Sequence, residues 1–167
     1  MRNLTFAAAS ALSGLFAVAS PLSAEPFGMK STDRIALVHA EGAQIYECQA
    51  DALGSLRWRF KEPIASLFEN GKTIGRHYAG PTWMLADGTV VTAKVVAQAP
   101  AATSGDIPEL MLTVISSKGD GAIAAAGTIV RMRTRGGVAQ GSCQTAGEFL
   151  SVSYSADYAF FAAARNN

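Results

Sequence analysis

The sequence predicts a single all-β domain, folded as one antiparallel β-barrel or closed β-sandwich. Short runs that are apolar, or that alternate between apolar and polar residues, begin at Arg34 and recur at regular spacing. Turn-forming pairs separate several of them, above all Asn70-Gly71 and Asp87-Gly88, because these residue types tolerate the positive φ of a tight hairpin turn. The alternation favours antiparallel strands with one face in water over a parallel sheet buried on both faces.

The same pattern predicts the strands and the faces of their side chains. Along the last strand, Tyr154 and Tyr158 share an apolar face, while Asp157 lies on the reverse. In the strand expected at residues 126–134, Arg131 and Arg133 share one face. The apolar residues Val130 and Met132 lie on the opposite face. Ten strands are expected, at residues 34–39, 43–49, 55–61, 64–69, 73–78, 82–86, 89–97, 109–116, 126–134 and 148–161.

The beginning of the chain is typical of a signal peptide. Arg2 precedes an almost uninterrupted apolar stretch from Leu4 to Val18, and small residues follow it. We expect cleavage after Ala24, with Ala19 as the alternative site. The apolar stretch is too short to span a bilayer comfortably, so we expect a periplasmic or secreted protein without a transmembrane segment after cleavage. Residues 1–24 would be the signal peptide, 25–33 a flexible leader and 34–167 the β domain.

Charge and glycine spacing exclude two classes of function. Without Arg2, the chain has as many Lys and Arg as Asp and Glu, which argues against nucleic acid as a partner. Gly119, Gly121 and Ala124 imitate the start of a dinucleotide-binding turn. However, a β-branched run follows too soon for a helix, and no acidic residue occurs from 122 through 147. We therefore expect no cofactor.

The two cysteines, Cys48 and Cys143, are expected to form a disulfide, because an exported chain is exposed to oxidising conditions. The alternative is a zinc site made by the same cysteines with His39 and His77. These residues have suitable donor atoms but lack the close spacing of known zinc motifs, so we expect no metal.

Several stretches, taken in order, resemble a known family of exported bacterial and fungal proteins, the domain-of-unknown-function family 3455. The resemblance covers roughly residues 36–161 and implies no established activity. The stretches are "GAQIYEC", "LRWRFKEPIASL", "GRHYAGPTWMLADGTVV", "IPELML", "TIVRMRTRGG" and "YSADYAFF", and the most specific are His77-x-x-Gly80-Pro81-x-Trp83 and Ala156-Asp157-Tyr158.

His77 allows two interpretations. A catalytic imidazole needs an orienting partner, which Asp87 or Asp157 could supply, and the protein would then be a hydrolase or lyase. However, the turn fully explains Asp87, and the sequence has no Gly-x-Ser-x-Gly nucleophile motif. We therefore favour a structural or ligand-contacting role for His77.

Our leading hypothesis is a non-enzymatic ligand-binding or envelope-associated module, with no predicted oligomeric state. Trp83 follows a Gly-Pro corner, where an exposed ring could stack on a sugar or another flat ligand, near Tyr154 and Tyr158. Arg131 and Arg133 could bind an anionic ligand, or simply form a solvated strand face. The partner would be an unknown small molecule or glycan, and a purely structural coat component is a third possibility.

Overall fold

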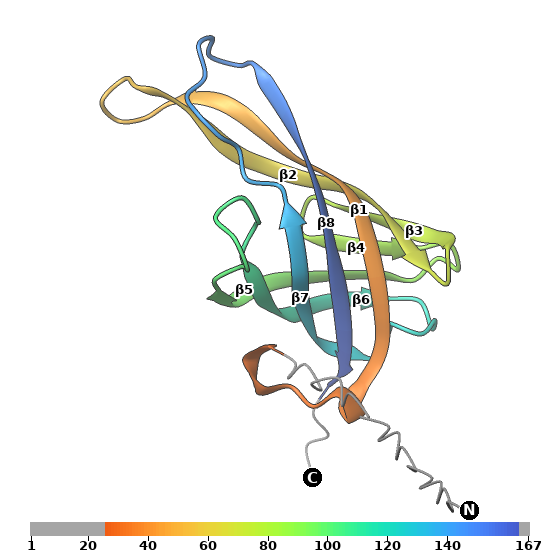
Figure 1. Ribbon diagram of the computed structural model, residues 1–167. Helices are drawn as coiled ribbons and strands as arrows, with labels where there is room; N and C mark the ends of the chain where they lie inside the picture. Colours follow the sequence, from red (N-terminus) through yellow and green to blue (C-terminus); the bar gives the residue numbers. More distant parts are fainter. Residues whose placement is uncertain (1–25, 164–167) are drawn as a thin grey trace, which may run out of the picture.

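A computed structural model describes residues 26–163 and shows one antiparallel sheet of eight strands that closes into a barrel (Figure 1). Each strand pairs with its neighbour in sequence, and β1 pairs with β8 to complete the ring. The predicted all-β barrel is therefore confirmed. The strands are β1 (Arg34–Ala50), β2 (Leu56–Glu69), β3 (Lys72–Tyr78), β4 (Thr82–Leu85), β5 (Val90–Ala99), β6 (Glu109–Lys118), β7 (Ala126–Gly136) and β8 (Phe149–Ala162).

Two long strands replace four of the ten predicted ones. β1 joins the predicted strands 34–39 and 43–49, and β2 joins 55–61 and 64–69. Gly42 and Pro63 suggested breaks between strands, but both are paired within the sheet. Gly42 pairs with Ala65, and Pro63 pairs with Gln44. Pro63 lies beside a shift in register between Ile45 and Tyr46, a position where a strand tolerates proline.

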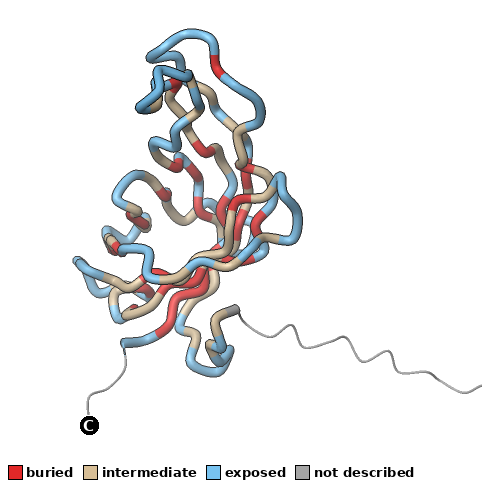
Figure 2. The backbone as a smooth tube through the Cα atoms, turned by 90° about the vertical axis from the view of Figure 1, so that its left-hand side faces the viewer, coloured by how far each residue is buried: buried red, intermediate tan, exposed pale blue. Residues whose placement is uncertain are grey.

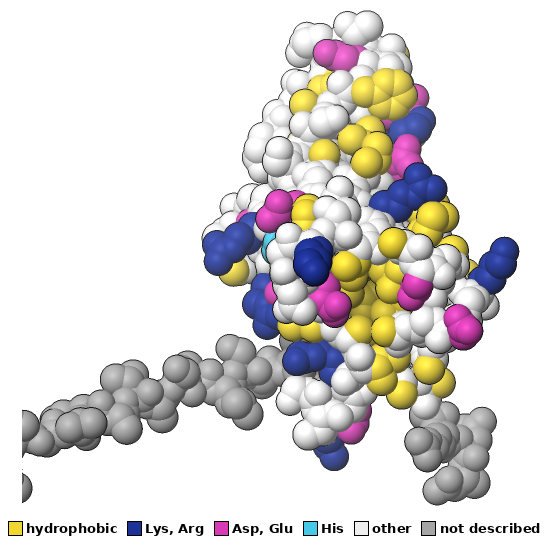
Figure 3. Space-filling view, turned by 90° about the vertical axis from the view of Figure 1, so that its right-hand side faces the viewer, with side chains coloured by type: hydrophobic (Ala, Val, Ile, Leu, Met, Phe, Trp, Pro, Cys, Tyr) yellow, Lys and Arg dark blue, Asp and Glu magenta, His cyan; other side chains and the backbone are white. Residues whose placement is uncertain are grey.

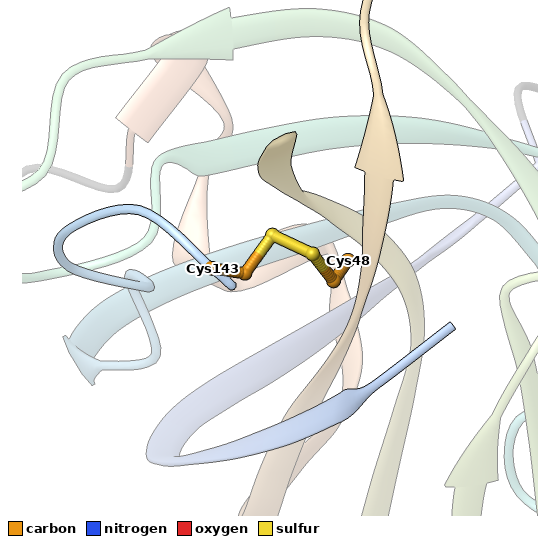
Figure 4. Close-up of a disulfide and its surroundings, with 2 residues drawn as sticks. All are labelled: Cys48 and Cys143. Carbon is orange, nitrogen blue, oxygen red and sulfur yellow. A yellow bond between two sulfur atoms is a disulfide. The ribbon is translucent and has the colours of Figure 1, made fainter. Parts of the chain in front are cut away.

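The end of β1, the start of β2 and the start of β8 project beyond the barrel (Figure 1). A disulfide between Cys48 of β1 and Cys143 of the β7–β8 loop holds this projection together (Figure 4). The backbone of Cys48 also bonds to the residues that precede β8, with its N–H to Glu148 and its carbonyl to Gly147. The predicted disulfide is thus confirmed, and it removes two of the four donors of the alternative zinc site.

The core lies inside the barrel, whereas the projection is mostly exposed or half-buried (Figure 2). Tyr154 and Tyr158 of β8 both belong to this core, as the alternation predicts. A second, smaller cluster includes Val130 of β7 and Phe161 of β8, with Phe27 and Met29 packed against it. The interior residues are Val38, Ala40, Ala65, Leu67, Trp83, Val91, Ala93, Ile107, Leu112, Ile123, Ala126, Ile129, Tyr154, Ala156, Tyr158 and Phe160.

Phe27 and Met29 come from the segment for which the sequence predicts a flexible leader. In the structure this segment contains two short 3-10 turns, η1 (Pro26–Gly28) and η2 (Ser31–Asp33). Because Phe27 and Met29 of this segment cover the outer side of β7 and β8, both faces of the sheet are buried there. The predicted signal peptide, residues 1–24, lies outside the described residues. Within residues 26–163, no helix has the length and apolar character needed to cross a membrane.

Candidate binding cavity

A cavity of about 330 Å³ lies beside the β3–β4 turn and reaches into the barrel. Most of its wall is apolar, and its polar side chains are Lys61, His77, Trp83, Arg131 and Tyr158. The two most specific stretches of the sequence meet here, since His77 and Trp83 come from one and Tyr158 from the other. The remaining lining residues are Phe60, Pro63, Ala79, Gly80, Pro81, Val95, Leu110 and Leu112.

His77 is held neutral and in one tautomer. Its Nδ1 lies 2.9 Å from the carbonyl oxygen of Thr82, and because a carbonyl can only accept, Nδ1 carries the hydrogen and donates it. Burial lowers the pKa of His77 to about 4; the hydrogen bond to Thr82 raises it, and the positive charge of Arg131 lowers it further. At neutral pH, Nε2 is therefore an unprotonated acceptor.

Trp83 is fully buried, so its ring is not the exposed stacking surface that the sequence left open as an alternative. Its indole stacks on the imidazole of His77, with ring centroids 4.5 Å apart and planes inclined by 18°. Tyr158 and Phe160 meet it edge to face at 5.1 Å and 5.9 Å. The ring packs here because His77 and Trp83 are direct partners across β3 and β4. Trp83 thus forms part of the cavity wall from within the core.

Arg131 points into the barrel rather than into solvent. The register places it between Leu110 of β6 and Tyr158 of β8, and both of these neighbours also line the cavity. Its Nε and Nη2 donate to the carbonyl oxygen of Pro108 at 3.1 Å and 2.8 Å. The alternation in the sequence predicted that Arg131 lies on a solvated face. In the structure the apolar neighbours Val130 and Met132 face outward and are covered by the leader, so Arg131 lies on the inner face.

Arg133 does not share this site. Its φ of 51° lies in the left-handed region, and the β7–β8 register shifts there, which separates Arg133 from Arg131. Its exposed guanidinium lies outside the barrel, with Nε 2.6 Å from Asp157. The two arginines, which the alternation places on one face, are therefore divided between the interior and the surface.

The two carboxylates proposed as partners of His77 bond to other residues. Asp157 lies on the outside of β8, where its other oxygen is 2.6 Å from Nδ1 of His39. Asp87 accepts a hydrogen bond from the backbone N–H of Thr89 at 2.8 Å. Asp87 borders a second hollow, and a hollow with an apolar floor is visible on that face in Figure 3. The described residues give His77 no carboxylate partner.

Three buried polar atoms lie near the cavity. Nε1 of Trp83 makes no hydrogen bond to the described residues, and the hydroxyls of Tyr154 and Tyr158 lie against each other. Burial raises the pKa of both tyrosines, so both are neutral. Tyr158 lines the cavity, whereas Tyr154 is buried behind it in the core.

The apolar wall is the part of the site that sequence reasoning missed. Phe60 and Val95 form its exposed rim, while Leu110 and Leu112 lie deeper. Alternation in "ELML" places Leu110 and Leu112 on one face, but only closure of the barrel brings that face to Arg131.

The comparisons with known proteins identify a family but no activity. No curated protein and no solved structure matches this chain. The model of one family, described as "Protein of unknown function (DUF3455)", matches residues 30–162. This range contains all eight strands and confirms the resemblance found in the sequence. Because the match covers most of its length, the chain belongs to the family of proteins of unknown function DUF3455.

Proposed function

We propose that the protein is a non-enzymatic binding protein that holds a small, mostly apolar molecule in the cavity beside the β3–β4 turn. The observation that carries this proposal is the cavity itself, an apolar space of about 330 Å³ with a few converging polar groups. Small-molecule sites have this composition and start at about 300 Å³. Eight-stranded barrels are also just wide enough to hold one small ligand.

The wall favours an apolar molecule over a glycan. A sugar presents many hydroxyl groups, and each one removed from water needs a hydrogen-bond partner. Phe60, Pro63, Leu110 and Leu112 offer side chains without polar atoms. An apolar ligand instead gains free energy from every part of this wall that it covers.

The surroundings of His77 support binding rather than hydrolase or lyase chemistry. A general base is oriented by a partner and lies within hydrogen-bond reach of the proton it takes. His77 donates to a backbone carbonyl and packs on Trp83, while Asp87 and Asp157 bond elsewhere. These contacts hold the imidazole as a neutral part of the wall.

The disulfide supports export to the periplasm or the cell exterior, because structural disulfides persist in oxidising compartments. Mass spectrometry of protein taken from a periplasmic fraction and from the medium tests this part. We expect the mass of a chain that begins after Ala24 with both cysteines oxidised. Full-length, reduced protein confined to the cytosol would contradict it.

A neutral fluorescent probe, N-phenyl-1-naphthylamine, tests the binding function. Its emission rises when it leaves water, so titration with the wild-type protein should give a saturable increase. Val95 and Val96 offer a matched pair of variants, since both are about half exposed and only Val95 lines the cavity. Val95→Trp should block the rim and abolish the increase, while Val96→Trp should preserve it.

Two results would overturn the proposal. One is a wild-type protein that leaves the probe's emission unchanged. The other is an equal loss in Val95→Trp and Val96→Trp, which would place the probe on the outer surface instead of in the cavity. Circular dichroism of both variants checks that each retains the β-sheet spectrum.

A further inference from the structure

We infer that the natural ligand of the cavity is an organic acid with an apolar body, whose carboxylate binds Arg131. This inference rests on the proposed binding function and specifies the class of ligand. It depends on three features of the cavity: a guanidinium without a counter-charge, two buried donor groups beside it, and a largely apolar wall.

Arg131 is a half-buried cation without a carboxylate partner among residues 26–163. Removing a charge from water is costly unless an opposite charge or strong hydrogen bonds compensate. The carbonyl of Pro108 takes two of the five guanidinium N–H groups and fixes the plane of the side chain. The remaining N–H groups match the geometry of a carboxylate, which guanidinium binds through two parallel hydrogen bonds.

The other cation of the cavity wall is already neutralised. Lys61 lies at the rim, with its ammonium 2.7 Å from a carboxylate oxygen of Glu47. Outside the barrel, Arg133 is similarly paired with Asp157 at 2.6 Å. Arg131 is therefore the cation in the cavity wall that lacks an acidic partner among the described residues.

Two buried donors accompany Arg131 in the wall. Trp83 and Tyr158 are 0% and 1% exposed. The indole N–H of Trp83 makes no hydrogen bond to the described residues, and the hydroxyl of Tyr158 lies against Tyr154 and Arg131. A buried donor without an acceptor is costly, and native proteins rarely leave one unpaired. Tyr158 lies directly across the β7–β8 ladder from Arg131, so an anion bound there would have a second donor beside it.

A matched pair of compounds tests the charge without changing the shape. 1-Naphthaleneacetate carries a carboxylate, and 1-naphthaleneacetamide is its neutral analogue of nearly the same size. Isothermal titration calorimetry at low salt should show the acetate binding the wild-type protein about tenfold more tightly, since hydrogen bonds to charged groups are stronger than neutral ones. Equal affinities, or tighter binding of the amide, would overturn the inference.

Variants identify the residue that provides the preference. Arg131→Met should bind both compounds with similar affinity, whereas Arg135→Met should keep the wild-type preference because Arg135 is exposed and outside the cavity wall. If Arg131→Met fails to fold, Arg131→Lys retains a positive charge and should still prefer the acetate. Loss of the preference in Lys61→Met but not in Arg131→Met would place the anion at the rim and contradict the inference.

The same data separate the two proposals. If the wild-type protein binds neither naphthalene compound nor N-phenyl-1-naphthylamine, the binding function itself fails. If it binds the neutral compounds as tightly as the acetate, the cavity is a binding site, but its ligand is not selected by an anionic group.

Discussion

His77 and Trp83 stack face to face as direct partners across β3 and β4, with their ring centroids 4.5 Å apart. The tight turn between them contains Gly80, whose φ of 130° is rarely adopted by residues with side chains. The same hairpin aligns Nδ1 of His77 with the carbonyl of Thr82. The stretch His-x-x-Gly-Pro-x-Trp is therefore a packing unit, and its inner surface is the wall of a cavity.

Burial of neutral His77 makes the protein less stable in mild acid. The pKa of His77 is about 4 in the folded protein and 6.5 in the unfolded chain, so the unfolded chain takes up the proton first as pH falls. Stability is then lost below about pH 6.5 and the loss levels off below about pH 4. Between about pH 7 and about pH 5, we expect the free energy of unfolding to fall by about 2 kcal/mol from this group.

Urea unfolding at several pH values measures this slope. His77→Phe preserves a ring on Trp83 but removes the titrating group, so its stability should depend less on pH in this interval. The difference between the two slopes isolates His77 from His39. Carboxyl groups stay ionised over most of the interval, so they contribute little. Identical slopes in the two proteins would show that His77 does not titrate on unfolding.

Trp83→Ala should destabilise the fold by about 3–5 kcal/mol, because it leaves a cavity in a fully buried aromatic cluster. Trp58→Ala is the matched control, since Trp58 is only half-buried and lies opposite Cys48 in the projection. Denaturant unfolding should show a clearly smaller loss for the control. If both variants lost the same stability, the barrel interior would not be the main core.

Short-range signals predicted the fold class well. Asn70 and Gly71 both have positive φ, as the expected hairpin turn requires, and they connect β2 and β3 directly. The alternation of β8 correctly placed Tyr154 and Tyr158 inside and Asp157 outside. These features depend on residues close in the chain, so the sequence contains enough information to predict them.

Which side chains lie inside the barrel could not be predicted from the sequence, because it depends on how the barrel closes. Trp58 lies in an apolar alternating run, yet its strand projects beyond the barrel, whereas Trp83 follows a turn and is fully buried. Arg131 faces inward because the leader covers the opposite, apolar side of β7. Periodicity distinguishes the two faces of a strand, but which face is interior depends on partners distant in sequence.

Loss of the disulfide should lower stability without changing the native structure. In the chain-entropy model, a link across 95 residues destabilises the unfolded chain by about 4–5 kcal/mol. Cys48→Ala combined with Cys143→Ala should lower the urea midpoint accordingly and leave the circular dichroism spectrum unchanged, because the backbone hydrogen bonds of Cys48 to the residues that precede β8 remain. An unchanged midpoint would contradict the prediction.

Gly42 allows β1 and β2 to approach each other closely. A Cβ atom at this position would lie 2.5 Å from Cα of Ala65 and would also overlap the carbonyl oxygen of Ile64. Because these are backbone atoms, the strands would have to separate, and Gly42→Ala should cost about 1–3 kcal/mol. Gly105→Ala is the control, since its nearest contact would be 3.8 Å away, on a side chain. Thermal unfolding should show a lower midpoint for Gly42→Ala and little change for Gly105→Ala. Equal midpoints would mean that β1 and β2 have room to adjust at Gly42.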